Sequence, residues 1–237
     1  GRGCGDVLAL GCARAAETRG RQAVELLQGG VTRAGERFNY VPQAYITTGI
    51  LHAMAPRQPI QQLHEITRLA IQWVYWAKGM PGANLSSSVF RAIARRFWGS
   101  ELGADFSTYE GKALAAKMIQ DREMVKESLV LCDNAWPILY VEHSLDHVGD
   151  PSLESKIFSA ITGRDMTEDE LNLVGERISN LQRAILAREG HRGRQCDTVP
   201  EASYTVPLES ERFNPDCLLP GKDGEVISRK GALFDRE

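Results

Sequence analysis

Apolar residues recur at helical spacing along much of the chain, and the pattern that organises it lies at 110–137. Its apolar members follow one another at steps of four, seven, four and three residues: Leu114, Met118, Val125, Leu129 and Cys132. That spacing places them on one face of an α-helix. We therefore predict one long helix that runs into Cys132. Its other faces are then available to the charged residues, which are Asp121, Arg122, Glu123, Lys126 and Glu127.

The same period predicts further helices at 5–19, 21–28, 59–78, 86–98, 152–161 and 167–188. The last begins with a capping box, Thr167 and Glu170, and ends near Gly190. Its apolar positions predict a core stripe: Leu171, Val174, Ile178, Leu181 and Ile185. Residues 31–54 have no clean period, so we predict a loop with short helical pieces there.

The last part of the chain has a different character. Residues 191–237 hold four of the ten prolines, and 220–224 has the composition of a turn. No strand alternation is convincing anywhere. The pattern predicts an all-α fold, with a multi-helix, bundle-like body at 1–190 and an extended, irregular strap at 191–237. The first residue is not Met and the last element has no clear end, so we expect a piece of a longer protein.

Composition narrows the class of protein. The 237 residues are 43% hydrophobic and 25% charged, which is ordinary for a soluble globular protein. A net charge of -3 gives no general case for nucleic acid or an anionic membrane. No apolar run is long enough to span a bilayer, and no signal peptide is visible. Five cysteines, an odd number without CxxC spacing, indicate a reducing compartment, so we expect a cytoplasmic protein.

Several residues could carry chemistry, and each also has a plainer interpretation. His64 is either a core or boundary histidine or a general acid/base. His143 and His147 share a helical spacing that zinc sites use, or belong to a polar surface turn. Arg91, Arg95 and Arg96 form a solvated face or a phosphate or partner site, and the carboxylates near 110–133 are expected to face solvent. From spacing alone, Cys132 is a buried structural cysteine, because one cysteine cannot define a metal site.

A series of short blocks carries a resemblance to a known family. They are GDVLALG at 5–11 with RAAE at 14–17, AMAPR at 53–57, EGKA at 110–113, QD at 120–121, ESLVLC at 127–132, TG at 162–163, GERI at 175–178, NL at 180–181 and REG at 188–190. In this order they resemble the C-terminal helical region, domains two and three, of the tungsten-containing aldehyde:ferredoxin oxidoreductases. The resemblance covers nearly the whole chain.

This resemblance implies a function that spacing could not. In the family, the cysteine that closes the D-x-x-G-L-C motif is the fourth ligand of a [4Fe–4S] cluster. Carried over, Cys132 is the cluster ligand, and Glu127 and Leu131 lie beside one of two pterins that hold tungsten (or molybdenum). The implied reaction oxidises aldehydes, with electron transfer to a ferredoxin-like or iron–sulfur acceptor. The resemblance makes His64 the candidate catalytic residue.

The chain also departs from the family pattern. Glu127 replaces the usual Asp, and Val130 replaces a Gly that would permit close backbone approach. His64 follows Arg57 by seven residues, where the family has about four. The segment PRQPIQQLHE at 56–65 is closer in sequence to the tungsten subunit of the benzoyl-CoA reductases, which reduce an aromatic thioester.

Parts of the family's site are absent from these 237 residues. The other three cluster cysteines, a CxxCxxxC run, and the N-terminal pterin-binding domain would be supplied by missing sequence, so we expect the isolated chain to be inactive. The alternative from another class is a non-catalytic all-α interaction module with structural cysteines.

Overall fold

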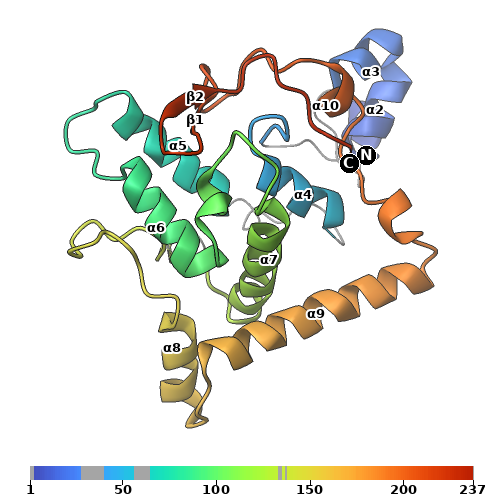
Figure 1. The fold of residues 1–237 in the computed structure, drawn as a ribbon. Helices are drawn as coiled ribbons and strands as arrows, with labels where there is room; N and C mark the ends of the chain where they lie inside the picture. Colours follow the sequence, from blue (N-terminus) through green and yellow to red (C-terminus); the bar gives the residue numbers. More distant parts are fainter. Residues whose placement is uncertain (1–2, 28–39, 56–64, 133–134, 137, 237) are drawn as a thin grey trace.

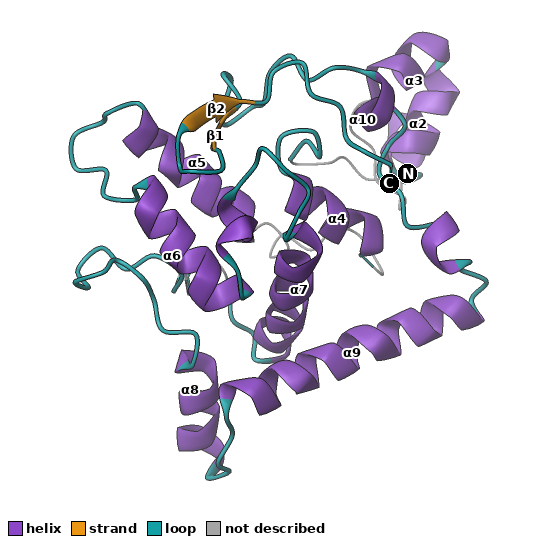
Figure 2. Cartoon of the chain, viewed as in Figure 1, coloured by secondary structure: helices purple, strands orange, loops and turns teal. Residues whose placement is uncertain are grey.

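A computed structural model describes residues 3–27, 40–55, 65–132, 135–136 and 138–236 of the chain. Helices dominate this part, which confirms the predicted fold class (Figures 1 and 2). The α-helices are α1 (Cys4–Leu8), α2 (Cys12–Arg19), α3 (Arg21–Leu27), α4 (Ile46–Met54), α5 (Glu65–Ala77), α6 (Ser87–Trp98), α7 (Lys112–Ser128), α8 (Leu153–Thr162), α9 (Glu168–Arg188) and α10 (Ala202–Thr205). Short 3-10 helices lie at η2 (Glu101–Ala104) and η3 (Gly193–Gln195). Of the helices described, none is both long enough and apolar enough to cross a bilayer.

The core lies among α4, α5, α6 and α7. Its largest buried side chains are aromatic: Trp73, Trp98, Tyr45, Phe90 and Phe106. Helix α7 stands in the middle of this group and contacts α4, α6 and α9 (Figure 1). Because of this central position, side chains of α7 can contact residues of several other elements.

One predicted helix at the N-terminal end has the wrong extent. The helix predicted at 5–19 is split into α1 and α2, because Gly11 has φ 81 and interrupts the helical backbone. Residues 31–39 lie outside the described part of the chain, and within 40–54 a short helical piece is present, as predicted: the largely buried nine-residue helix α4. Its inward face carries polar residues such as Thr47, Thr48 and His52, so an apolar stripe could not reveal it. The hydroxyls of Thr48 and Thr67 are hydrogen-bonded at 2.6 Å, which satisfies one of these groups in the core.

Helix α9 confirms its predicted capping box and only part of its predicted core stripe: Leu171 is buried and Ile178 packs against the core. The Thr167 side chain accepts from the Glu170 backbone N–H, and the Glu170 carboxylate accepts from the Thr167 N–H. The buried residues are Leu171, Gly175 and Ser179, whereas Leu181 is 63% exposed and Ile185 48% exposed. Because Gly175 has no side chain, α9 comes so close to α7 that a Cβ there would lie 1.9 Å from the Asp121 carbonyl oxygen.

The strap contains the one pair of strands in the described residues, where no strand was predicted. Strands β1 (Leu218–Pro220) and β2 (Val226–Ser228) pair antiparallel, with Leu219 opposite Ile227. Three residues per strand are too few for a visible alternation. The turn predicted at 220–224 connects them, with Gly224 at φ 84. Both Cys217 and Leu219 are fully buried, so the strap completes the core.

Candidate functional site

Helix α7 ends in a geometry that sets the direction of the Cys132 segment. The Leu131 N–H donates to the Lys126 carbonyl at 2.8 Å, and the Val130 N–H donates to that of Glu127 at 3.1 Å. With Val130 at φ 58, these are the two bonds of a Schellman C-cap. The helix therefore stops at Ser128, four residues short of the predicted end.

Cys132 lies beyond the helix, and its side chain is exposed. Its carbonyl accepts hydrogen bonds from the N–H groups of Ala135 and Trp136, at 2.9 and 2.7 Å. The predicted inward stripe is therefore wrong at its ends: Cys132 is exposed and Leu114 is 43% exposed.

The face of α7 that is buried combines small residues with charged ones. Its members are Ala115, Ala116, Ile119, Arg122, Glu123 and Lys126. The prediction that the charged residues occupy the other faces is thus wrong for four of the five: Asp121, Arg122, Glu123 and Lys126 are buried. Asp121, also expected to face solvent, is 4% exposed.

These charges form a buried ion network with two other helices. Arg122 Nη1 lies 2.7 Å from Glu65 Oε2 of α5, and Nη2 lies 3.0 Å from Glu154 Oε1 of α8. Lys126 Nζ lies 2.8 Å from Glu123 Oε1 and 3.5 Å from Glu65 Oε2. The Arg122 guanidinium also lies over the Phe97 ring, 4.8 Å from its centroid. Breaking such a network by removing one member is costly, because it leaves an uncompensated buried charge.

The network fixes the charge state of its members. Burial acts to raise the pKa of Glu65, but Arg122 and Lys126 outweigh it and lower that pKa to about 2. Burial acts to lower the pKa of Arg122, but the carboxylates of Glu65 and Glu154 raise it overall. Glu65 is therefore an anion at neutral pH, able to accept hydrogen bonds but unable to donate a proton.

Two indole groups connect the network to its surroundings. Trp98 Nε1 donates to Glu65 Oε1 at 3.0 Å, and Trp136 Nε1 donates to Glu154 Oε1 at 3.1 Å. Trp136 belongs to the turn that the Cys132 carbonyl closes. The segment that carries Cys132 is thus tied to the buried charges.

A cavity of about 220 Å³ opens above this network. Glu65, Arg122 and Lys126 line one side of it. The remaining lining is mostly apolar and aromatic: Leu69, Trp136, Ile138, Leu139 and Tyr140. Three further lining residues are polar or charged: Arg68, Gln72 and Glu142. Apolar walls with a few charged groups are typical of small-molecule sites, and this volume suits a small ligand.

The other candidates from the sequence lie in different places. His64 falls outside the described residues, but its neighbour Glu65 lines the cavity. Glu127 and Leu131 are half-buried on either side of the helix end. His147 stacks on Tyr140 and contacts the Glu142 carbonyl through Nδ1 at 2.9 Å. The described residues contain no group of three or more His, Cys, Asp or Glu side chains placed to hold a metal ion.

The arginines of α6 pair within the chain. Arg91 and Arg95 contact Glu101, and Arg96 Nη2 lies 2.8 Å from Asp146. These pairs match the interpretation of a solvated face.

Sequence reasoning missed the ion network itself. The signal available was weak: Ala115, Ala116 and Ile119 share a helical face with Arg122 and Lys126. Small residues on a face permit close packing, but charged residues are rarely buried, so the larger apolar residues defined the predicted stripe instead.

The chain matches a known protein family. A family model described as "Aldehyde ferredoxin oxidoreductase, domains 2 & 3" matches residues 1–218. No solved structure gives a significant match to the chain. The matched range includes α1 to α10, the cavity and the Cys132 segment.

Proposed function

Because the chain belongs to the aldehyde ferredoxin oxidoreductase family, we propose that it forms the cluster-proximal and substrate-proximal half of such an enzyme. In the complete protein, Cys132 is one ligand of a [4Fe–4S] cluster, and Glu127 and Leu131 lie beside the pterin that carries tungsten (or molybdenum). The observation that carries the proposal is the family match across the Cys132 block. An interaction module with structural cysteines is disfavoured by the same match.

The residues of this chain fit a shared cluster site. Cys132 has an exposed thiol at a chain reversal, as a ligand to an external group requires. A cluster of this type needs four thiolates, and the part of the chain that the structure describes has no group of three or more potential ligands placed to hold a metal. The remaining ligands then come from the N-terminal domain, which also supplies most of the pterin contacts. When bound, the cluster supplies electron transfer between the metal centre and a ferredoxin-like acceptor.

The chain's own contribution lies in the cavity beside Trp136. Its apolar wall excludes water from a small carbonyl compound, and the Arg122 and Lys126 charges are balanced by carboxylates rather than left to bind an anion. Glu65 stays ionised and holds Arg122 in place, so it acts as a positioning residue. A proton donor or acceptor must be another group, and His64, next to Glu65 in the sequence, is our candidate.

The cluster proposal is tested by iron content. In the full-length protein, Cys132→Ala should lower the iron bound per chain and change the cluster's electron paramagnetic resonance spectrum. Cys12→Ala, which removes another exposed cysteine, is the matched control and should leave both unchanged. Unchanged iron and an unchanged spectrum in Cys132→Ala would rule out ligation by this residue.

The role of His64 is tested separately. His64→Asn in the full-length enzyme should lower turnover while tungsten content stays at the wild-type level. Wild-type turnover in that variant would remove His64 from the catalytic site.

The direction of the reaction separates the two branches of the family. The sequence at 56–65 favours the benzoyl-CoA reductase branch as the second candidate. Assays of one preparation with simple aldehydes and with an aromatic thioester would decide between them. If the preparation is active with the thioester and inactive with aldehydes, the proposed reaction is reduction of an aromatic thioester and not aldehyde oxidation.

A further inference from the structure

Next to the ion network, a second and much smaller cavity lies where α7, α8 and α9 meet. Its volume is about 10 Å³. Arg122 lines both this cavity and the larger one beside Trp136. The small cavity is also lined by Glu154 of α8 and by Glu168 and Asn172 of α9.

Two buried polar atoms at this cavity have no hydrogen-bond partner in the part of the chain that the structure describes: Arg122 Nε and Glu154 Oε2. The other atoms of these two groups are bonded. Arg122 Nη1 donates to Glu65 and Nη2 to Glu154 Oε1, which also accepts from Trp136. Arg122 and Glu154 are only 6% and 3% exposed. A buried donor and a buried acceptor that are both unpaired indicate that another group belongs between them.

The size and the chemistry of the cavity select one water molecule. A volume of about 10–15 Å³ is the least that holds a water, so there is room for one and for no larger ligand. The Arg122 guanidinium disfavours a cation here, and the carboxylates of Glu154 and Glu168 disfavour an anion. A water can accept from Arg122 Nε–H and donate to Glu154 Oε2 at the same time. Buried waters make about three hydrogen bonds, and the Asn172 amide offers the third because it carries both a donor and an acceptor.

The start of α9 connects this cavity with solvent. Glu168 and Asn172 are half-buried. Burial raises the pKa of the Glu168 carboxyl, and of the two charged groups at the cavity, Arg122 acts to lower that pKa and Glu154 to raise it. The Glu168 carboxyl therefore lies within electrostatic reach of both.

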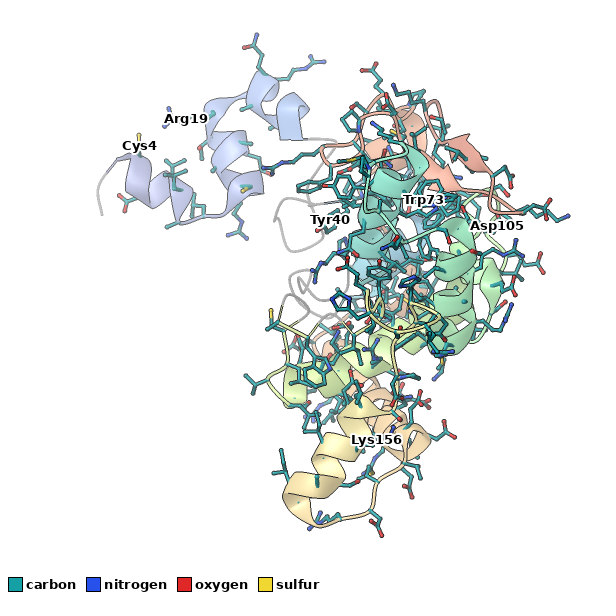
Figure 3. All side chains as sticks on the ribbon, turned by 90° about the vertical axis from the view of Figure 1, so that its left-hand side faces the viewer. Cys4, Arg19, Tyr40, Trp73, Asp105 and Lys156 are labelled. Atoms are coloured by element: carbon teal, nitrogen blue, oxygen red, sulfur yellow. The ribbon has the colours of Figure 1, made fainter. Side chains whose placement is uncertain are left out.

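We propose that the small cavity binds one ordered water, which bridges Arg122 Nε to Glu154 Oε2 and also bonds to the Asn172 side chain. The water then joins α7, α8 and α9 at one point; Lys156 marks α8 in Figure 3. It completes the ion network, because each nitrogen of the Arg122 guanidinium then has a partner.

This water reaches the network by a different route from the larger cavity. Glu65 and Lys126 line the larger cavity, where a ligand would bind. The water site is reached from the start of α9 instead. Arg122 therefore keeps its third partner whether the larger cavity is open or filled. The inference does not depend on the reaction proposed for the enzyme.

A crystal structure of the full-length protein, at a resolution that shows ordered waters, tests the proposal directly. We expect a density peak within hydrogen-bond distance of Arg122 Nε, Glu154 Oε2 and the Asn172 side chain. A site without a peak would overturn the proposal, as would a direct hydrogen bond between Nε and Oε2. A metal ion in that place, recognised by contacts of about 2.0–2.6 Å to the carboxylates, would overturn it too.

Val125→Ile in the full-length protein tests whether the cavity is hydrated or dry. Val125 lines the cavity, so the added methylene group has to expel the water and leave both polar atoms unpaired. Its melting temperature should fall further than that of Val74→Ile. Val74 is the matched control, because it is a buried valine of α5 that does not line the cavity. A melting temperature equal to or above that of Val74→Ile would show that the methylene group fills a dry space, and would overturn the proposal.

Asn172→Leu tests the contact to α9. It removes the third partner of the water without changing any charge, so its melting temperature should lie below that of Asn180→Leu. Asn180 is the matched control, an exposed residue of the same helix. Both variants exchange Asn for Leu within α9, so both gain the same helix propensity. Equal melting temperatures would show that α9 does not hold the water, and would overturn the bridge between three helices.

Discussion

At the residue scale, the most informative position is Val130. It occupies the left-handed conformation that ends α7, with φ 58, and its side chain is 90% exposed. A β-branched residue in that conformation is strained by about 1–2 kcal/mol, and no packing compensates for it. The family motif that 127–132 resembles has Gly at this position. The C-cap geometry gives a physical reason for that Gly, because Gly adopts the left-handed conformation without strain. From the sequence alone, Val130 was visible only as a difference from the family motif.

Val130→Gly should therefore stabilise the chain. We expect a gain of about 1 kcal/mol in the free energy of unfolding, reduced by the extra freedom that Gly has in the unfolded state. Urea denaturation of both proteins would measure it. Ser128→Gly, inside the last helical turn, is the contrasting control and should destabilise the chain. A loss of stability in Val130→Gly would show that the strain at this position is not significant.

Glu65 gives a prediction for acid stability. Its pKa is lowered from 4.5 to about 2 in the folded chain, so its stabilising effect is complete above pH 4.5 and is lost as the pH falls toward 2. Glu65→Gln should cost about 3–5 kcal/mol at pH 7, since Arg122 and Lys126 lose a counter-charge. The difference in unfolding free energy between wild type and variant should shrink as the pH falls from 4.5 to 2. Asp146→Asn, at an exposed ion pair, should show little effect, and a pH-independent difference at Glu65 would contradict the assignment.

At the element scale, the packing of α9 against α7 depends on one glycine. Gly175→Ala would place a Cβ where the Asp121 carbonyl oxygen now lies, so the two helices must separate. We expect a loss of about 1–3 kcal/mol or more in unfolding free energy, typical of overpacked contacts. Gly5→Ala, in the open surroundings of α1, should be neutral or slightly stabilising. Thermal unfolding of the two variants would compare them, and equal melting temperatures would show that α9 can shift freely.

The same scale shows which elements the sequence predicts well. Amphipathic helices with polar caps, α6 and α9, begin at the predicted residues because Ser86 and Thr167 are strong N-caps. Helix α4 and the inner face of α7 were not predictable in this way. Their buried sides carry Thr, His, Arg and Lys, whose burial depends on partners from distant elements. The same holds for the site. A sequence motif was enough to select Cys132 as a candidate ligand, but its exposure could not be predicted because it depends on where α7 ends.

At the scale of the whole molecule, one arginine of the strap, Arg229, joins it to two distant segments of the body. Arg229 Nε donates to the Gln43 carbonyl at 2.6 Å, and Nη1 donates to the Phe106 carbonyl at 2.8 Å. It thus joins the C-terminal hairpin to the segment before α4 and to the one after η2. The body and the strap, which composition alone divides at residue 190, share one core through these bonds.

Arg229→Met should loosen this attachment. Two backbone carbonyls lose a charged donor, and we expect a cost of about 2–3 kcal/mol in unfolding free energy. Limited proteolysis should then cut within 202–236 faster than in the wild type. Lys230→Met, which removes an exposed neighbouring charge, is the matched control and should leave the cleavage rate unchanged. Identical proteolysis in all three proteins would mean that the strap's other contacts hold it without Arg229.

The two indole hydrogen bonds to the ion network have a consequence for how the protein can be studied. Trp98 contacts the Glu65 carboxylate and Trp136 the Glu154 carboxylate, and Trp136 also lines the cavity. Indole emission responds to the field of an adjacent charge and to contact with water. The chain therefore carries its own optical reporters, one inside the network and one at the cavity. The chain has four tryptophans in all, and Trp136→Phe removes the one at the cavity. The difference in emission between wild type and this variant is therefore the cavity signal, through which ligand entry could be followed without a label.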